Sequence, residues 1–338
     1  MKEAMFYEKL DDNMVKCNLC SHRCSLIADS KRGICGVREN RAGKLYSLVY
    51  GKAVACAVDP IEKKPLFNFL AGSQAYSIAT VGCNFRCDNC QNFDISQLPK
   101  QRNVIVGQEV SPEDVVFAAL QSNCKSIAYT YSEPTIFFEY AYDIAKLAHK
   151  QGLKNVFVTN GYITQDALIE ISPYLDAANI DLKSFSDDFY QKRCGAHLQP
   201  VLDSIKLYKS LGIWIELTTL IIPTLNDSEQ ELHKIAHFIK EEVGEDTPWH
   251  ITQFHPTYNL IDLPRTPVTT LRRARKIGLE AGLRYVYEGN VPGETGENTY
   301  CPNCKKTLIQ RFGYHIQENK IKDSKCIYCG AKIDGVHM

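Results

Sequence analysis

Three cysteines share one short loop of the chain. Cys83, Cys87 and Cys90 have the spacing C-x3-C-x2-C. Three thiolates this close together suit a cubane iron–sulfur cluster, and three protein ligands leave one iron of a [4Fe–4S] cube open for chemistry. Zinc is the alternative, but structural zinc takes four ligands, usually as two C-x2-C pairs, and no histidine lies nearby in the sequence. The spacing therefore predicts a [4Fe–4S] cluster.

A second set of cysteines lies near the C-terminal end of the chain. Cys301 and Cys304 form one C-x2-C pair, and Cys326 and Cys329 form another pair 21 residues further on. Two such pairs are typical of a zinc ribbon with four thiolate ligands. A segment of about 40 residues buries little apolar surface, so the metal is expected to supply much of its folding energy.

A third set lies near the N-terminal end. Cys17, Cys20, Cys24 and Cys35 fall within about 20 residues, which indicates one metal site. Zinc is our first interpretation, and an auxiliary iron–sulfur cluster is the alternative. His22 could replace one ligand, although a surface histidine between ligands is the simpler interpretation. The remaining cysteines are Cys56, Cys124 and Cys194, and we interpret Cys124 as a small buried apolar side chain.

Composition places the chain among ordinary globular proteins. Its 338 residues are 44% hydrophobic and 23% charged, with a net charge of +0, so bulk charge favours neither nucleic acid nor an anionic membrane. We find no apolar run long enough to span a membrane, and acidic residues stand where a signal peptide needs an apolar core. We expect a cytoplasmic protein, in which 14 cysteines serve metals rather than disulfides.

From residue 76 onward, apolar strands alternate with amphipathic helices. Repeated β–α units predict an α/β fold with a parallel sheet, either doubly wound or a partial barrel. The expected strands are 76–81, 126–131, 155–159, 178–183, 214–222, 249–254 and 284–287. Expected helices begin after the N-cap Ser111 and cover 136–151, 228–242 and 269–281. We divide the chain into an N-terminal Cys-rich segment (1–74), a core (75–290) and a four-cysteine zinc-ribbon-like module (291–338).

Functional side chains are expected at the C-terminal ends of these strands. Strand four ends in Asp181-Leu182-Lys183, and residues i and i+2 share a face, so Asp181 and Lys183 point the same way, inward. A buried lysine needs a partner, which Asp181 could provide. Strand two is followed by Ser132 and Glu133, where a helix N-terminus with a favourable glutamate is the alternative interpretation.

The cysteine spacing after an apolar strand resembles that of radical S-adenosylmethionine (SAM) enzymes. The resemblance implies a partial (β/α)6-type TIM barrel in which the open iron binds SAM. It further implies that a reduced cluster cleaves SAM and that the resulting 5′-deoxyadenosyl radical abstracts a hydrogen atom. A low-potential electron donor of the flavodoxin or ferredoxin type is the implied partner. This chain has Asn89 where many members carry an aromatic residue beside the adenine.

The resemblance also implies a set of SAM-binding residues. Glu133 and Pro134 match the end of a Gly-Gly-Glu-Pro segment whose two glycines are here Tyr131 and Ser132. Asn160 lies in a matching Thr-Asn-Gly, and the SAM carboxylate could pair with Lys183. His255 matches a ribose-contacting histidine of pyruvate formate-lyase activating enzymes. The resulting cofactor-binding set is Ser132, Glu133, Asn160, Asp181, Lys183 and His255. Strand five departs from that pattern, because Glu216 and Thr218 stand where those enzymes carry an arginine.

The whole chain resembles the radical SAM member of the AmmeMemoRadiSam system, through Cys17-Asn18-Leu19-Cys20, the run 33–40 and the run 296–304. The substrate and the catalytic residues beyond the cofactor site stay open. A glycyl-radical activase acting on a protein partner is one alternative, although residues 92–123 lack the cysteines that such activases carry. A non-catalytic zinc-ribbon protein that binds nucleic acid or protein is the other. We expect the ribbon to lie over the mouth of the active site, with residues 292–298 at the entrance.

Overall fold

The computed structural model of the protein describes residues 1–25 and 27–338 and is built around one eight-stranded sheet. Seven strands run parallel, and β7 pairs with β8 in the antiparallel sense at one edge. The order is β15-β14-β13-β12-β11-β10-β8-β7, so the sheet has the neighbour-by-neighbour order of a barrel that is left open. The strands are β7 Ala55–Pro60, β8 Gln74–Ala79, β10 Ser126–Tyr129, β11 Lys154–Thr159, β12 Ala177–Asp181, β13 Trp214–Ile221, β14 Trp249–Gln253 and β15 Val286–Gly289. The expected α/β fold with a mostly parallel sheet is confirmed.

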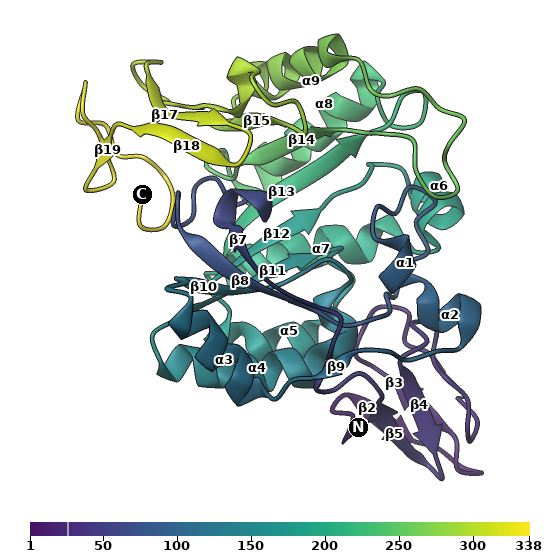
Figure 1. Ribbon diagram of the computed structural model, residues 1–338. Coiled ribbons are helices and arrows are strands. Elements are labelled where there is room, and N and C mark those ends of the chain that lie inside the picture. The colour runs from purple at the N-terminus through teal and green to yellow at the C-terminus, as the bar shows by residue number, and fades with distance from the viewer. Residues whose placement is uncertain (26) are drawn as a thin grey trace.

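Helices follow the strands and flank the sheet (Figure 1). The longer ones are α3 Pro112–Gln121, α4 Phe138–Lys150, α5 Gln165–Ile171, α7 Leu198–Ser210, α8 Glu229–Phe238 and α9 Val268–Glu280. Ser111 is the N-cap of α3: its hydroxyl accepts from the Asp114 backbone in a capping box, as its residue type predicts. Short helices are α1 Phe93–Ser96, α2 Leu98–Arg102 and α6 Asp187–Phe189, with 3₁₀ turns at η1 Ile61–Lys63, η2 Pro134–Phe137, η3 Ser172–Tyr174 and η6 Thr295–Glu297 and π turns at η4 Tyr190–Cys194 and η5 Ile239–Val243.

The connection between β7 and β8 closes the barrel at the N-terminal ends of its strands. Glu216, near the start of β13, is fully buried and accepts hydrogen bonds from the backbone nitrogens of Phe67 (2.9 Å) and Asn68 (2.7 Å). His250 Nε2 lies 2.7 Å from the same carboxylate. Glu216 therefore anchors this connection, far from the strand ends where SAM was expected.

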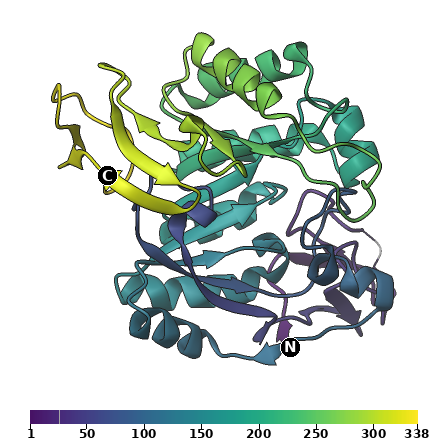
Figure 2. The ribbon, with the colours of Figure 1, turned by 45° about the horizontal axis from the view of Figure 1, so that its top comes forward.

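Residues 1–53 form an N-terminal module of short strands. These are β1 Lys2–Glu3, β2 Tyr7–Lys9, β3 Val15–Cys17, β4 Arg38–Arg41, β5 Lys44–Ser47 and β6 Lys52–Ala53, of which β6 pairs with β9 Gln108–Glu109. Arg38 joins the module to α4 through a bidentate ion pair with Glu139, at 2.8 and 2.9 Å, and both side chains are buried. Figures 1 and 2 both show the module beside α2, away from the C-terminus.

Residues 299–338 form a C-terminal module. Its strands are β16 Thr299–Tyr300, β17 Thr307–Phe312, β18 His315–Asn319, β19 Ile321–Lys322 and β20 Lys325–Cys326. Cys301 packs in one apolar cluster with Tyr285, which precedes β15. The four cysteines of this module thus lie at the N-terminal ends of the parallel strands. The prediction that the ribbon covers the active-site mouth is therefore wrong for its cysteine site. Only the β17–β18 turn reaches the cavity, through Tyr314.

No helix in the described part of the chain is long and apolar enough to cross a membrane.

Candidate functional site

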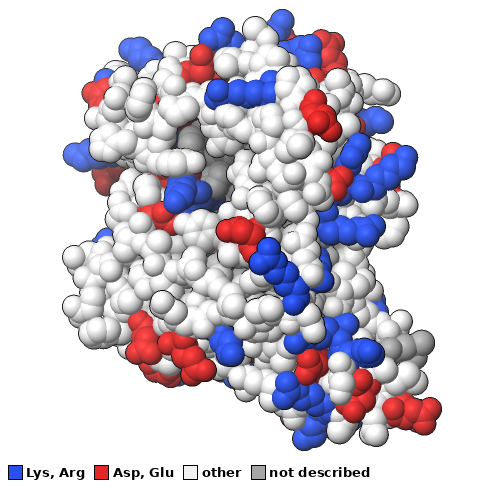
Figure 3. Space-filling view, turned by 45° about the vertical axis from the view of Figure 1, so that its right-hand side comes forward, with Lys and Arg blue, Asp and Glu red and all other residues white. Residues whose placement is uncertain are grey.

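A cavity of about 400 Å³ opens at the C-terminal ends of the parallel strands. Its wall includes Cys83, Cys87 and Cys90, which follow β8, together with residues that end β10 to β14. The face that carries these strand ends is hollowed, and Figure 3 shows Lys or Arg and Asp or Glu side chains at the rim of the hollow. Parallel strands collect their following loops at one edge, which is why side chains far apart in sequence meet here.

The loop that carries the three cysteines begins with a backbone turn only glycine takes easily. Gly82 has a φ of +103°, and a Cβ built on it would lie 2.5 Å from Cγ1 of Val37. The loop is then held by its own neighbours. The carbonyl oxygen of Phe85 accepts bonds from Gln97 Nε2 (3.1 Å) and Lys100 Nζ (2.7 Å), and Cys90 Sγ lies 3.2 Å from Ser96 Oγ.

The segment after η4 supports the loop from the other side. Arg86 N donates to the Cys194 carbonyl at 2.9 Å, and Asp88 N donates to the Arg193 carbonyl at 3.0 Å. A hydrogen bond with the Cys194 thiol, together with burial, raises the pKa of Cys87. Cys194, which the spacing rules left without a role, therefore lies against a predicted cluster ligand.

Burial shapes the chemistry of the cysteine loop. It raises the pKa of Cys83 and of Cys90, so an iron-binding reaction must displace protons from both thiols. Asn84 accepts a 2.7 Å bond from Asn160 Nδ2 through Oδ1, while its own Nδ2 is buried without a partner in the described chain. A buried N–H donor without a partner in the described chain therefore lies next to Cys83, although the lining of the cavity does not include Asn84.

Glu133 does not offer a free carboxylate to the cavity. Its Oε1 accepts from Thr135 N (3.0 Å), Thr135 Oγ1 (2.6 Å) and Thr159 Oγ1 (2.7 Å), and its Oε2 accepts from Asn160 N (2.8 Å). Complete burial raises the pKa of Glu133 despite these donors. The side chain therefore ties the ends of β10 and β11 together, and this geometry gives it a positioning role.

Ser132 presents its hydroxyl differently. Its Oγ is buried, lies in the wall of the cavity and has no hydrogen-bond partner in the described chain. Tyr131, just before it, adopts a left-handed φ of +63°, the conformation that glycine favours. Its hydroxyl bonds to Asp59, and Lys64 Nζ lies 4.5 Å from its ring centroid. This anchoring holds a non-glycine residue where the resembling segment has glycine.

Asp181 and Lys183 pair at the end of β12, as the strand pattern predicts. Lys183 Nζ donates to Asp181 Oδ2 at 2.8 Å, and both side chains line the cavity. Burial opposes the charge on Lys183, but Asp181 and the nearby Cys87 outweigh it and raise the lysine pKa. The ammonium group therefore stays charged at neutral pH.

The structure brings five of the six predicted cofactor-binding residues to the cavity wall. They are Ser132, Glu133, Asn160, Asp181 and Lys183; the lining does not include His255, which follows β14. Asn89 lines the cavity, and so does Thr218 of the divergent strand. Lining residues not anticipated from the sequence include Lys63, Thr130, Thr252, Asn290 and Tyr314. Asn290 directly follows β15 and could have been found at that strand end, but Tyr314 comes from another module and had no signal.

The C-terminal cysteines form a compact group. Cys301 and Cys329 have their sulfur atoms 3.7 Å apart, those of Cys304 and Cys326 are 3.8 Å apart, and all four lie within 4.8 Å of one another. Bonds from the Ala331 backbone and Asn303 lower the pKa of Cys329 to about 6. The group is suited to hold a metal ion. The N-terminal cysteines line a separate, much smaller cavity beside Arg38.

Two basic residues of the C-terminal module are engaged within the protein. Arg311 is buried and bonds to the Phe67 carbonyl, and Lys320 pairs with Glu318 at 2.7 Å. Lys305, Lys306, Lys322 and Lys325 are exposed, so the nucleic-acid alternative stays open.

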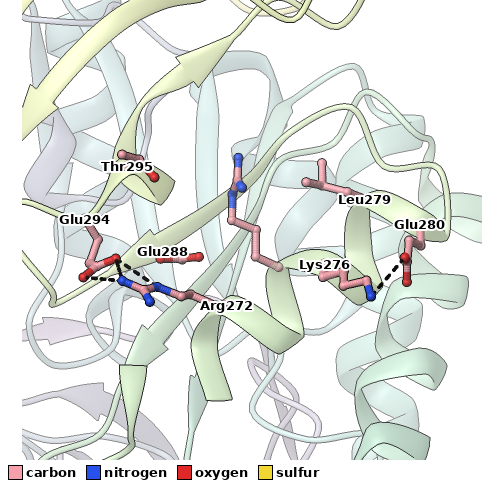
Figure 4. Close-up of a pocket in the computed structure, with 8 residues that line it drawn as sticks. Arg272, Lys276, Leu279, Glu280, Glu288, Glu294 and Thr295 are labelled. Atoms are coloured by element: carbon pink, nitrogen blue, oxygen red, sulfur yellow. Dashed lines mark hydrogen bonds and ion pairs between the residues drawn. The ribbon is translucent and has the colours of Figure 1, made fainter. Parts of the chain in front are cut away.

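Another hollow, of about 490 Å³, lies between α9 and the segment 288–295 (Figure 4). Arg272 forms a bidentate ion pair with Glu294 across it, and Lys276 lies 3.7 Å from Glu280. No cysteine lines this hollow. Exposed ion pairs of this kind contribute little binding energy, and the chemistry of the chain lies elsewhere.

A protein-family pattern matches the part of the chain that carries Cys83, Cys87 and Cys90. The Radical SAM superfamily pattern matches residues 77–239. The chain is 49% identical to the uncharacterized protein MJ0808 of Methanocaldococcus jannaschii over 336 residues, 99% of each chain. It is 25% identical to the pyruvate formate-lyase-activating enzyme of Clostridium pasteurianum over 61% of this chain and 89% of that protein. The fold resembles that of Streptococcus suis SuiB bound to S-adenosylmethionine, with a TM-score of 0.51 and 11% identity over 68% of this chain and 53% of that one.

Proposed function

Because the chain belongs to the radical SAM superfamily, whose members are enzymes that use SAM and a [4Fe–4S] cluster, we propose that Cys83, Cys87 and Cys90 hold this cluster and that SAM binds beside it in the 400 Å³ cavity. The observation that carries the proposal is the placement of the three thiols on one braced loop at the C-terminal edge of a parallel sheet. When bound, this pair of cofactors supplies a 5′-deoxyadenosyl radical that abstracts hydrogen from a substrate.

The cavity wall fits such a ligand in size and polarity. A volume of about 400 Å³ is within the usual range for a small-molecule site. The buried Ser132 Oγ, in the cavity wall, has no partner in the described chain, so a polar ligand would satisfy a group that is costly to leave unpaired. Lys183 provides a cation for a carboxylate, and Glu133 holds the backbone of Asn160 beside the ligand.

The experiment is a SAM-cleavage assay on anaerobically purified protein. Replacing Cys83, Cys87 or Cys90 by Ala should abolish 5′-deoxyadenosine formation with dithionite as reductant, because two remaining ligands hold a cube poorly. Cys124→Ala is the matched control, since Cys124 is buried away from the three sets. Persistent SAM cleavage in any of the three single variants, measured by chromatography, contradicts the assignment.

Two features bear on what enters the cavity. Tyr314 contributes a wall from the C-terminal module, and Lys63 contributes a cation from the β7–β8 connection. We propose that these side chains meet the substrate, whose identity is open. Cluster reduction requires a low-potential one-electron donor, which we take to be of the flavodoxin or ferredoxin type.

A glycyl-radical activase is the second candidate function. The likeness to the activating enzyme of Clostridium pasteurianum favours it, and it would make the substrate a glycine of a protein partner. The absence of cysteines between residues 92 and 123 speaks against the usual form of such an activase. We further propose membership of the AmmeMemoRadiSam group, on the strength of the runs 33–40 and 296–304. An electron paramagnetic resonance (EPR) search for a glycyl radical in partner proteins separates the two functions.

A further inference from the structure

The four N-terminal cysteines converge on one small cavity. Cys17, Cys20, Cys24 and Cys35 all line it, and its volume is about 10 Å³. Three of the four side chains are buried, and Cys24 is partly exposed. Four cysteines around one cavity, three of them buried, indicate a metal centre.

The spacing of the sulfur atoms separates this site from the C-terminal one. A zinc ion bonds each thiolate at about 2.3 Å in a tetrahedron, so its sulfur atoms stand about 3.8 Å apart. The C-terminal set has that spacing, at 3.7 and 3.8 Å. Among the described residues, no other group brings three such ligand atoms within 4.8 Å of one another, so neither the N-terminal set nor the Cys83 loop has it.

In a cubane cluster each cysteine binds a different iron at a different corner, so its sulfur atoms stand further apart than those of a zinc site. The N-terminal set shares this property with the Cys83 loop.

A buried cation faces the same cavity. Arg38 lines it with only 2% of its surface exposed, and its Nε has no partner in the described chain. The other end of the guanidinium is held by Glu139. A four-thiolate cluster carries net negative charge, and N–H donors to its sulfur atoms tune its potential. Arg38 offers one free N–H donor, its Nε, to such a group, while its charge is paired with Glu139.

The N-terminal site also touches the first cluster loop. His22, between two of the cysteines, has Nε2 2.9 Å from the Asn84 carbonyl oxygen. The Cys35 carbonyl lies 3.3 Å from the position that a Cβ on Gly82 would take, and Gly82 precedes Cys83. The segments that carry the two cysteine sets thus contact each other at Asn84 and at Gly82.

We propose that Cys17, Cys20, Cys24 and Cys35 bind a second iron–sulfur cluster of the cubane type. All of its irons have protein ligands, so it does not bind SAM and is suited to carry electrons. This inference stands independently of SAM chemistry at the first cluster, because it rests on the N-terminal residues alone.

The test counts iron, sulfide and zinc in the full-length chain, reconstituted anaerobically. The parent should hold about eight iron atoms, which is two cubane clusters. Replacing Cys83, Cys87 and Cys90 together by Ser should leave about four iron atoms and an EPR signal of the reduced cluster that added SAM does not change. Cys20→Ser/Cys24→Ser should also leave about four, with a signal that SAM does change. Cys124→Ser, outside both sites, should keep the parent content.

The outcomes separate the proposals. If the triple variant retains no iron and the parent contains two zinc ions per chain, one more than the C-terminal set can hold, the second cluster is refuted and the N-terminal site is a zinc site. Because the triple variant leaves the N-terminal module intact, this result does not depend on whether Cys20→Ser/Cys24→Ser folds. If the triple variant keeps all the iron of the parent, the first cluster is refuted and the second is not.

Discussion

Lys183→Ala should weaken SAM binding by about tenfold to a hundredfold without loss of iron. In the structure the Lys183 ammonium lies in the cavity wall 2.8 Å from Asp181, and only 20% of the side chain is exposed, so water screens it little. A hydrogen bond to a charged group contributes about 1.5–3 kcal/mol, which converts to that range of affinity. The substitution also leaves the Asp181 carboxylate facing a ligand carboxylate, which pushes the effect toward the upper end.

The assay is anaerobic calorimetric titration of SAM into reconstituted protein, with iron content measured on the same sample. Lys183→Arg keeps the charge and should recover part of the affinity, although its fork has a different geometry. Asp181→Asn/Lys183→Ala removes the residual repulsion and should bind better than Lys183→Ala alone. His255→Ala is the comparison, because His255 does not line the cavity. An unchanged dissociation constant for Lys183→Ala, or a larger loss for His255→Ala, refutes this account of the site.

Three further changes test the framework around the site. Glu139→Gln should lower the free energy of unfolding by about 3–5 kcal/mol, because it leaves Arg38 buried without its charged partner. For a chain of 338 residues this is a fall in Tm of about 4–7 °C by circular dichroism. Asp188→Asn breaks an ion pair whose two side chains are 70% exposed and should change Tm by about 1 °C or less, so equal shifts in the two variants would count against the buried pair. Gly82→Ala should lower the free energy of unfolding by about 1–3 kcal/mol more than Gly152→Ala. Both glycines have positive φ, but only a Cβ on Gly82 would clash with another side chain. The urea midpoints and iron contents of the two variants are the measurement, and equal values would contradict the prediction. Removing metal with a chelator should expose the C-terminal module to protease before the barrel, since a module of this size depends on its metal for folding, and simultaneous cleavage of both would contradict that dependence.

The parallel sheet could be predicted from the sequence because its strands are apolar runs of regular spacing. Each expected strand corresponds to one observed strand within a few residues, and the inward pair Asp181 and Lys183 follows from strand alternation alone. The antiparallel edge strand β7 was not predicted, because residues 55–60 lie outside the β–α repeats from which the other strands were predicted. Helices α5 and α7 were not specified either.

Contacts between residues that are far apart in the sequence could not be predicted. Glu133 was expected to grip SAM, but its carboxylate is taken up by Thr135, Thr159 and Asn160, and motif matching cannot show such competition. We expected the C-terminal cysteine site near the active-site mouth, because the glycine-rich segment before Cys301 indicated local turns. Its position is instead fixed by apolar packing of Cys301 with Tyr285. The SAM contacts themselves stay predictions.

The closure of the barrel floor has a consequence for how the protein is made. Asn68 Nδ2 donates to the Asp334 carbonyl at 2.8 Å, and Phe69 forms a bridge with Val336, so the β7–β8 connection bonds to the end of the chain. During synthesis, residues 66–70 emerge some 266 positions before their partners, and contacts this remote in sequence form late. The floor therefore stays unfinished until the C-terminal module leaves the ribosome. If Cys301, Cys304, Cys326 and Cys329 hold a metal ion, its scarcity would then appear as slow maturation of the whole protein rather than as a local defect.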